Sequence, residues 1–76
     1  ADVADRAAPE EVVALDDALA RLAGEDPQAA QIVKLRVFAG LSVDQAAQVV
    51  GVSRATAYRQ WTYARAWLRS DIEGSR

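Results

Sequence analysis

The sequence predicts an all-α fold of four helices without a sheet, and three observations support this prediction. Hydrophobic residues make up 51% of the 76 residues, but aromatic residues make up only 7%. This composition, rich in alanine and leucine, favours close-packed helices over sheets built from β-branched and aromatic pairs. Apolar residues recur at helical spacing, and prolines, glycines and capping residues divide the chain into four such segments. At this length we expect one small domain.

The residue inventory excludes several kinds of site. Cysteine and histidine are both absent, which excludes disulfide bonds, the usual zinc sites and acid-base catalysis by histidine. We therefore expect no cofactor, no metal site and no enzymatic activity. No apolar run has membrane-spanning length and no signal-peptide pattern opens the chain. We expect a soluble, cytoplasmic protein and, since methionine is absent, a piece of a longer one.

The first helix is predicted to begin near Pro9, a residue suited to the first helical position, and to end at Gly24. Its apolar positions at helical spacing are Val12, Leu15, Leu19 and Leu22. The acidic residues of this segment, including Asp16 and Asp17, are interpreted as a solvated helix face rather than a paired-carboxylate site. Residues 1–8 are expected to be a frayed leader.

The second helix is predicted to have Asp26 as its N-cap and Pro27 at its first position, and to end at Gly40. We expect it to be central, with a broad apolar surface formed by Ile32, Val33, Leu35, Val37 and Phe38. A short third helix follows. It opens with a capping-box pattern from Ser42 to Gln45 and breaks at Gly51. Its expected buried residues are Val43, Ala46, Ala47 and Val50.

The fourth helix is predicted to run from an N-cap at Ser53 to about Ser70. One stripe along it should anchor the helix to the core, and this stripe consists of Ala57, Trp61, Ala64 and Leu68. Trp67 lies off the stripe and is expected to pack against the first helix. Residues 73–76 are expected to be a frayed tail.

The charges are divided unevenly between the two ends of this chain, whose formal net charge is −2. Residues 1–26 carry eight acidic and two basic residues, whereas residues 27–76 carry three acidic and seven basic residues. Four arginines and no acidic residue lie between Gly51 and Ser70. A local positive field could therefore exist on an acidic molecule. The alternative is an ordinary solvated helix face.

Residues 42–70 fit a helix-turn-helix motif. Such a motif needs a small residue where the two helices cross, a turn residue that tolerates a left-handed backbone, and an apolar residue after it. Ala47, Gly51 and Val52 stand at these three positions. A structural hairpin of two helices would show the same pattern and remains the alternative.

The side of the last helix opposite its anchoring stripe carries the residues suited to DNA. At 100° per residue this side holds Ala55, Arg59, Thr62, Tyr63 and Ala66, flanked by Arg54, Tyr58, Arg65 and Arg69. Arg59 can offer a bidentate fork to guanine, and a threonine methyl or tyrosine ring can meet a thymine methyl. Ser53, Arg54, Thr56 and Arg65 are better placed for phosphates, which fix register without reading sequence.

These residues carry a family resemblance. The stretch AGLSVDQAAQVVGVSRATAYRQWTYARAWLRSDI (39–72) resembles region 4 of an extracytoplasmic-function (ECF) sigma factor of the sigma-70 family. The preceding LDDALARLAGEDPQAAQIVKLRVF (15–38) is similar to the two helices that lead into that region. The resemblance covers about residues 12–72, and it implies a sigma region 4 domain over residues 9–72. Region 2 of the family is absent, so we expect one part of a sigma factor.

The resemblance implies a bacterial initiation factor whose last helix binds the −35 element of double-stranded promoter DNA. Its earlier helices would bind the β flap of the RNA polymerase core, and anti-sigma factors commonly mask the same domain. The base-reading positions of the family fall on Tyr58, Arg59, Thr62 and Tyr63. Arg54 and Arg65 are its implied backbone contacts. We expect a monomer.

Two other functions fit the same residues. The DNA-binding domain of a response regulator has the same four-helix fold and also shows the letters GLS before its turn. The acidic first helix and the letters ARAWL fit that class less well. The other is a helical protein-interaction domain that docks an anti-sigma factor or the flap through Val37, Leu41 and Trp67, with negligible DNA binding.

Overall fold

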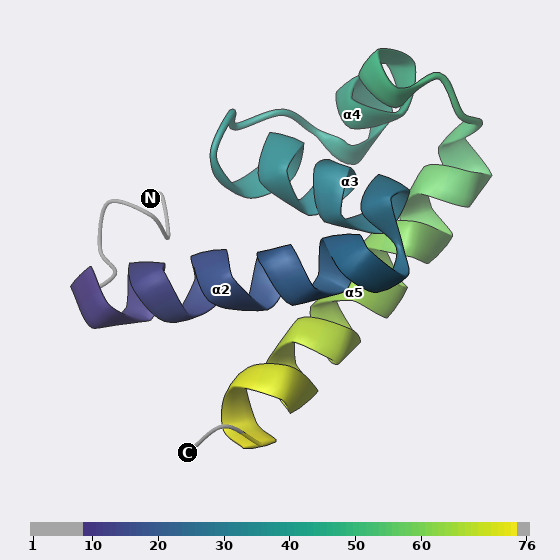
Figure 1. Cartoon of the computed structure of the whole chain (residues 1–76). Coiled ribbons are helices and arrows are strands. Elements are labelled where there is room, and N and C mark those ends of the chain that lie inside the picture. The colour runs from purple at the N-terminus through teal and green to yellow at the C-terminus, as the bar shows by residue number, and fades with distance from the viewer. Residues whose placement is uncertain (1–8, 75–76) are drawn as a thin grey trace.

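The computed structural model describes residues 9–74, with side chains from residue 13 onward. Within this range lie the helices α2 (Pro9–Glu25), α3 (Pro27–Val37), α4 (Val43–Val50) and α5 (Arg54–Gly74). None of the described residues is in a strand (Figure 1). The predicted all-α fold of four helices is therefore confirmed. The predicted leader, residues 1–8, and residues 75–76 lie outside the described residues.

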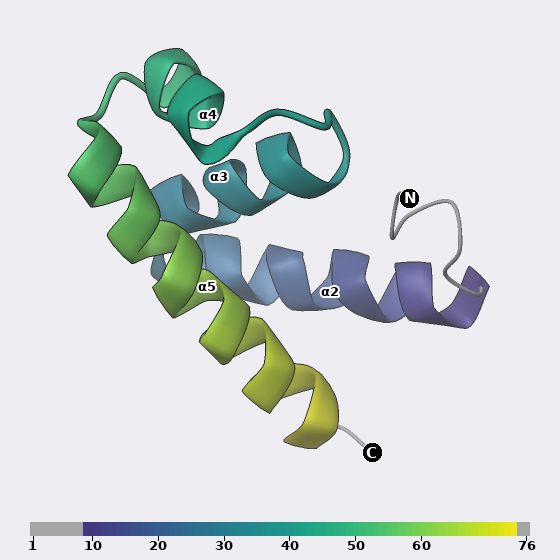
Figure 2. The ribbon, with the colours of Figure 1, turned by 180° about the vertical axis from the view of Figure 1, so that it is seen from behind.

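Helix α3 is central, as the sequence predicted. It packs against α2, α4 and α5, and α5 likewise contacts each of the other three helices. Figure 1 and Figure 2, which are opposite views, show α2 and α4 on either side of α3, with α5 running diagonally across the group. The first half of α5 therefore meets α4, and its second half meets α2.

The buried core consists of two clusters that share α3 and α5. The first joins α2, α3 and α5 through Ala18, Leu19, Leu22, Ala29, Ala30, Val33, Ala64 and Leu68. The second joins α3, α4 and α5 through Ile32, Val43, Ala47 and Ala57. Half-buried Trp61 packs against both clusters. Because full burial of a leucine or isoleucine side chain contributes about 1.5–3 kcal/mol, these clusters fix the orientation of α5.

Caps define the beginnings of the two middle helices. The Asp26 carboxylate accepts a hydrogen bond from the Ala29 N–H at 3.1 Å, which makes it the N-cap of α3. The capping box of α4 is present: Ser42 Oγ accepts from the Gln45 N–H at 3.0 Å, and Gln45 Oε1 accepts from the Ser42 N–H at 2.9 Å. These bonds satisfy N–H groups that have no partner within a helix.

The end of α3 differs from the prediction. The helix ends at Val37 rather than Gly40, and Phe38, predicted to lie on its apolar surface, comes after the helix and is 47% exposed. Its turn is held by the Arg36 side chain, whose Nη1 donates to the Leu41 carbonyl at 2.9 Å. Gly40 lies within this turn at a φ of +74°. Leu35, Val37 and Val50 are half-buried, and the side chain of Val12 lies outside the described ones.

Helices α2 and α5, by contrast, end later than predicted. Helix α2 continues through Gly24 to Glu25, and α5 continues past Ser70 to Gly74. The extra turn of α5 has tertiary partners, because Asp71 pairs with Arg21 at 2.6 Å and Ile72 packs against the first cluster. The first two residues of the expected frayed tail, Glu73 and Gly74, are therefore helical.

Candidate nucleic-acid interface

The turn between α4 and α5 depends on three residues. Gly51 has a left-handed backbone, with φ 87° and ψ 33°. Its N–H and that of Val52 both donate to the Ala47 carbonyl, at 2.8 and 3.0 Å. Ala47 is buried with Ala57 in the second cluster, and Val52 packs against that cluster. The small side chain of Ala47 thus lets α4 pack closely on α5, which is the arrangement that a helix-turn-helix requires.

The Ser53 hydroxyl caps the beginning of α5. Ser53 Oγ accepts from the Thr56 N–H at 3.1 Å and donates to Thr56 Oγ1 at 2.9 Å. These bonds fix the helix start and occupy both side chains. A phosphate at this end would therefore be met first by the backbone end of the helix.

One side of α5 faces solvent from its first residue to Ser70. We call it the outward face, and its exposed residues are Arg54, Ala55, Tyr58, Arg59, Thr62, Tyr63, Arg65, Ala66, Arg69 and Ser70. The opposite side holds buried Ala57, Ala64 and Leu68. Of the predicted DNA-binding residues, Thr56 is half-buried and the others are exposed. The face carries four arginines without an acidic residue.

Arg54 is positioned by contacts on both sides. Its Nε lies 2.9 Å from Asp44 Oδ1 of α4, and its guanidinium carbon lies 5.4 Å from the centre of the Tyr58 ring. The interaction with the Tyr58 side chain, followed by the Asp44 charge, raises the pKa of Arg54 above its ordinary value. These contacts hold the Arg54 cation between the two helices of the motif.

Arg59 has looser contacts than Arg54. Its Nη2 donates to Thr56 Oγ1 at 3.4 Å, near the limit for a hydrogen bond. The small side chains of Ala55 and Ala66 are exposed on the same face. A guanidinium with this freedom, on a face that can approach a duplex closely, is suited to the major-groove edge of guanine.

The Trp61 ring lies near two arginines from different helices. The guanidinium carbon of Arg36 lies 4.9 Å from the centre of the ring, and that of Arg65 lies 5.5 Å from it. Cations at such distances are attracted by the indole π system. Arg65 is exposed on the outward face, so its charge is available to a phosphate while Trp61 limits its movement.

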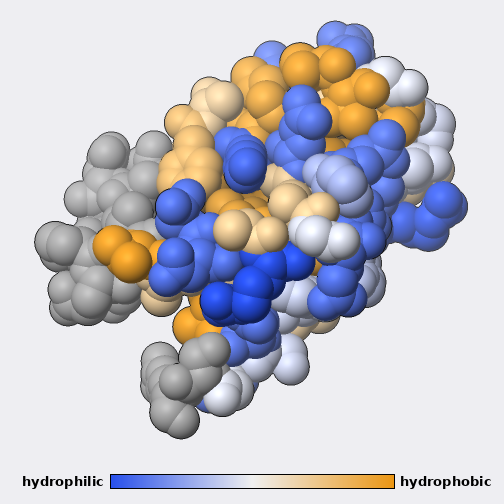
Figure 3. Space-filling view, in the orientation of Figure 1, coloured by the Kyte–Doolittle hydropathy of each residue, from blue (hydrophilic) through white to orange (hydrophobic). Residues whose placement is uncertain are grey.

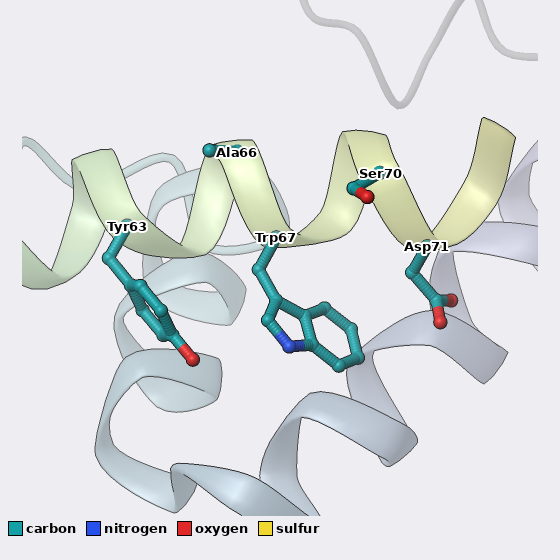
Figure 4. Close-up of a pocket in the computed structure, with 5 residues that line it drawn as sticks. All are labelled: Tyr63, Ala66, Trp67, Ser70 and Asp71. Atoms are coloured by element: carbon teal, nitrogen blue, oxygen red, sulfur yellow. The ribbon is translucent and has the colours of Figure 1, made fainter. Parts of the chain in front are cut away.

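Tyr63 lies at the edge of the outward face. Figure 4 shows its ring on the same side of α5 as the Trp67 ring, and both line a shallow pocket with Ala66, Ser70 and Asp71. Tyr63 is 47% exposed, and Trp67 packs against the first cluster, which includes residues of α2. Part of the Tyr63 ring therefore faces this pocket rather than a groove of DNA.

A comparison with protein families decides what kind of chain this is. The family model described as ECF sigma factor matches residues 1–74. The chain belongs to the ECF sigma factor family. Its role is therefore in bacterial transcription initiation, and the partners of the family in general are DNA and RNA polymerase. No curated protein and no solved structure matches the chain.

Three polar residues of this sigma-factor chain support the site without having been predicted to do so. Asp44 binds Arg54, Arg36 fastens the loop before α4, and Gln28 Oε1 accepts from Gln60 Nε2 of α5 at 2.6 Å. Of the three, only Asp44 could have been singled out from the sequence, as an acid in the first turn of α4. The contacts of Arg36 and Gln28 join residues of different elements and correspond to no sequence pattern.

The remaining surface of the sigma-factor chain offers few other kinds of site. Among the described residues, no helix is both long and apolar enough to cross a membrane. The same residues contain no group of three or more acidic, cysteine or histidine side chains placed to hold a metal ion. Figure 3 shows hydrophobic surface over α4, where Val49 is 59% exposed.

Proposed function

We propose that this chain binds the −35 element of bacterial promoters by placing the outward face of α5 in the major groove. The observation that carries the proposal is this acid-free face, presented by a helix that the Gly51 turn and the core clusters hold rigidly. The major groove admits one α-helix, and a helix-turn-helix presents its second helix to it. Membership of the ECF sigma factor family supports the same role.

Different residues of the face have different roles in this proposal. Arg59 reads a base edge, with Tyr58 and Thr62 beside it, and Tyr63 contributes from the edge of the face. Arg54 and Arg65 contact phosphates, because their guanidinium groups are already held at 5.4 and 5.5 Å from aromatic rings. Ser53 and Thr56 place the positive end of the helix near a phosphate.

Binding to a duplex selected from a randomised pool tests this function. We expect the wild-type chain to enrich a common sequence and to bind it, by fluorescence anisotropy, more tightly than a scrambled duplex. Arg59→Ala should remove most of that preference, because a bidentate base contact contributes about 1–3 kcal/mol of discrimination. Lys34→Ala, an equal charge loss at an exposed site on α3, is the matched control. Enrichment of no sequence would contradict the proposal.

We also propose that the end of α3 docks on the β flap of RNA polymerase. Phe38 is 47% exposed there, beside half-buried Val37 and Leu41, and Arg36 holds the loop that presents them. An exposed aromatic residue on a loop that a hydrogen bond holds in place is suited to anchor a protein interface. An anti-sigma factor would compete for the same domain, and the chain would act as a cytoplasmic monomer.

A pull-down with a flap fragment tests the docking surface. We expect Phe38→Ser to reduce retention of the chain on the immobilised flap and to leave duplex binding unchanged. Val49→Ser, at an exposed apolar residue of α4, is the matched control. Retention of the Phe38 variant at the wild-type level would exclude this surface.

A further inference from the structure

The ion pair between Asp44 and Arg54 crosses the helix-turn-helix. Asp44 lies in the first turn of α4, and Arg54 is the first residue of α5. The joined atoms are 2.9 Å apart, and the two side chains are 54% and 72% exposed, respectively. Asp44 therefore places a negative charge beside the arginine that begins the outward face.

The contribution of this ion pair to folding stability is too small to explain its presence. A solvent-exposed ion pair adds little to folding, because water screens it and two side chains lose freedom. An acid in the first turn does favour the helix dipole, but that effect does not require contact with Arg54. The contact would affect the binding of a DNA phosphate, because the phosphate would approach an Arg54 cation that is already paired with Asp44.

We propose that Asp44 is a counter-charge that sets the affinity of this chain for DNA. It holds Arg54 in the free protein, and it repels the phosphate that Arg54 meets in the complex. Phosphate contacts carry no sequence information, so the carboxylate weakens binding to every duplex and leaves base reading to Arg59. This inference rests on the proposed DNA-binding function.

The test measures binding of Asp44→Asn to the selected duplex and to its scrambled form. Loss of the carboxylate removes its repulsion of the phosphate that Arg54 meets, so we expect both duplexes to bind about three- to tenfold more tightly. Between about 50 and 200 mM salt, the logarithmic salt slope should become steeper by about one unit. Asp16→Asn removes the same charge from an exposed position on α2 and should change neither quantity. Thermal melting followed by circular dichroism verifies that each variant is folded.

The double variant Asp44→Asn/Arg54→Ala assigns the effect to the ion pair. We expect it to bind as Arg54→Ala alone does, because the carboxylate acts through the arginine. If Asp44→Asn increased DNA affinity as much in the Arg54→Ala variant as it does in wild type, the proposed pairing would be overturned. Weaker binding by Asp44→Asn would overturn it too, since Asp44 would then position Arg54 for DNA rather than oppose its phosphate contact.

Two further outcomes separate this inference from the proposed function. If Asp44→Asn binds like wild type, while wild type keeps its Arg59-dependent preference, the counter-charge is overturned and promoter reading stands. If neither duplex binds to wild type or to any variant, the counter-charge and the proposed promoter reading are both overturned.

Elution from a heparin column gives an independent measure of affinity for a polyanion. Later elution of Asp44→Asn than of Asp16→Asn supports the counter-charge, and equal elution contradicts it.

Discussion

Ala47 of α4 and Ala57 of α5 are buried in one hydrophobic cluster, with 4% and 0% of their surface exposed. Their small side chains allow the two helices of the motif to pack closely. The angle at which α5 is presented to solvent depends on this contact. Changes here should therefore alter stability and DNA binding together.

Ala47→Leu tests the close packing. A larger side chain overpacks the cluster, so we expect the free energy of unfolding to fall by about 1–3 kcal/mol, measured by urea denaturation. Ala55→Leu is the matched control, because Ala55 is exposed on the outward face. It should leave stability nearly unchanged but weaken duplex binding by keeping the helix out of the groove. Equal stability of the two variants would contradict the packing.

Gly51→Ala tests the turn. Gly51 has a φ of +87°, and a Cβ built there meets no atom within 4 Å, so the expected cost is conformational alone. We expect a loss of about 1–2 kcal/mol in urea denaturation. Gly24→Ala provides a control of opposite sign: Gly24 is helical with equally open space, and alanine there should stabilise by about 0.5 kcal/mol. If Gly51→Ala were as stable as wild type, the turn would be able to adopt a backbone conformation other than the left-handed one.

Asp71→Asn tests the extra turn of α5. Arg21 donates from Nη2 and Nε to Asp71 Oδ2, at 2.6 and 3.1 Å, across 50 residues of sequence. Without this pair we expect faster amide hydrogen exchange in residues 72–74 and little change elsewhere. Asp16→Asn, at an exposed acid on the same α2 as Arg21, should not change exchange at the end of α5. Unchanged exchange in the Asp71 variant would contradict the role of the Arg21 pair in holding this turn.

Arg65→Ala should weaken binding to all duplexes alike. Its cation lies beside Trp61 and is assigned to a phosphate, so the logarithmic salt slope should become shallower by about one unit. Arg59→Ala should instead reduce the difference between the selected and scrambled duplexes. Anisotropy titrations at several salt concentrations measure both quantities. If the two variants gave the same pattern, the division between backbone contact and base reading would be wrong.

Local signals were sufficient to predict most of the fold. The N-cap at Asp26, the capping box at Ser42 and the left-handed Gly51 are each encoded within a few residues, and each is present in the structure. The outward face of α5 also followed from periodicity, since its exposed and buried residues alternate as an amphipathic helix requires. These features depend on neighbours in sequence.

The features that sequence reasoning missed depend on contacts between distant segments. Helix α5 ends later than predicted because Asp71 finds Arg21 on another helix. Phe38 fits an apolar helical pattern, but the chain turns before it and leaves it exposed. Asp44 lies inside the capping-box segment, but its pairing with Arg54 depends on the crossing of α4 and α5. The helical spacing of residues in the sequence does not predict such contacts between different helices.

The most direct test of promoter reading by α5 is an NMR titration of the isotope-labelled chain with the selected duplex. We predict that the largest amide shifts occur at the Gly51 turn and along the outward face, at Arg54, Tyr58, Arg59 and Thr62. Buried Ala64 and the residues of α2 should shift little. Shifts concentrated on α2 or around Trp67, with the outward face unchanged, would contradict the account.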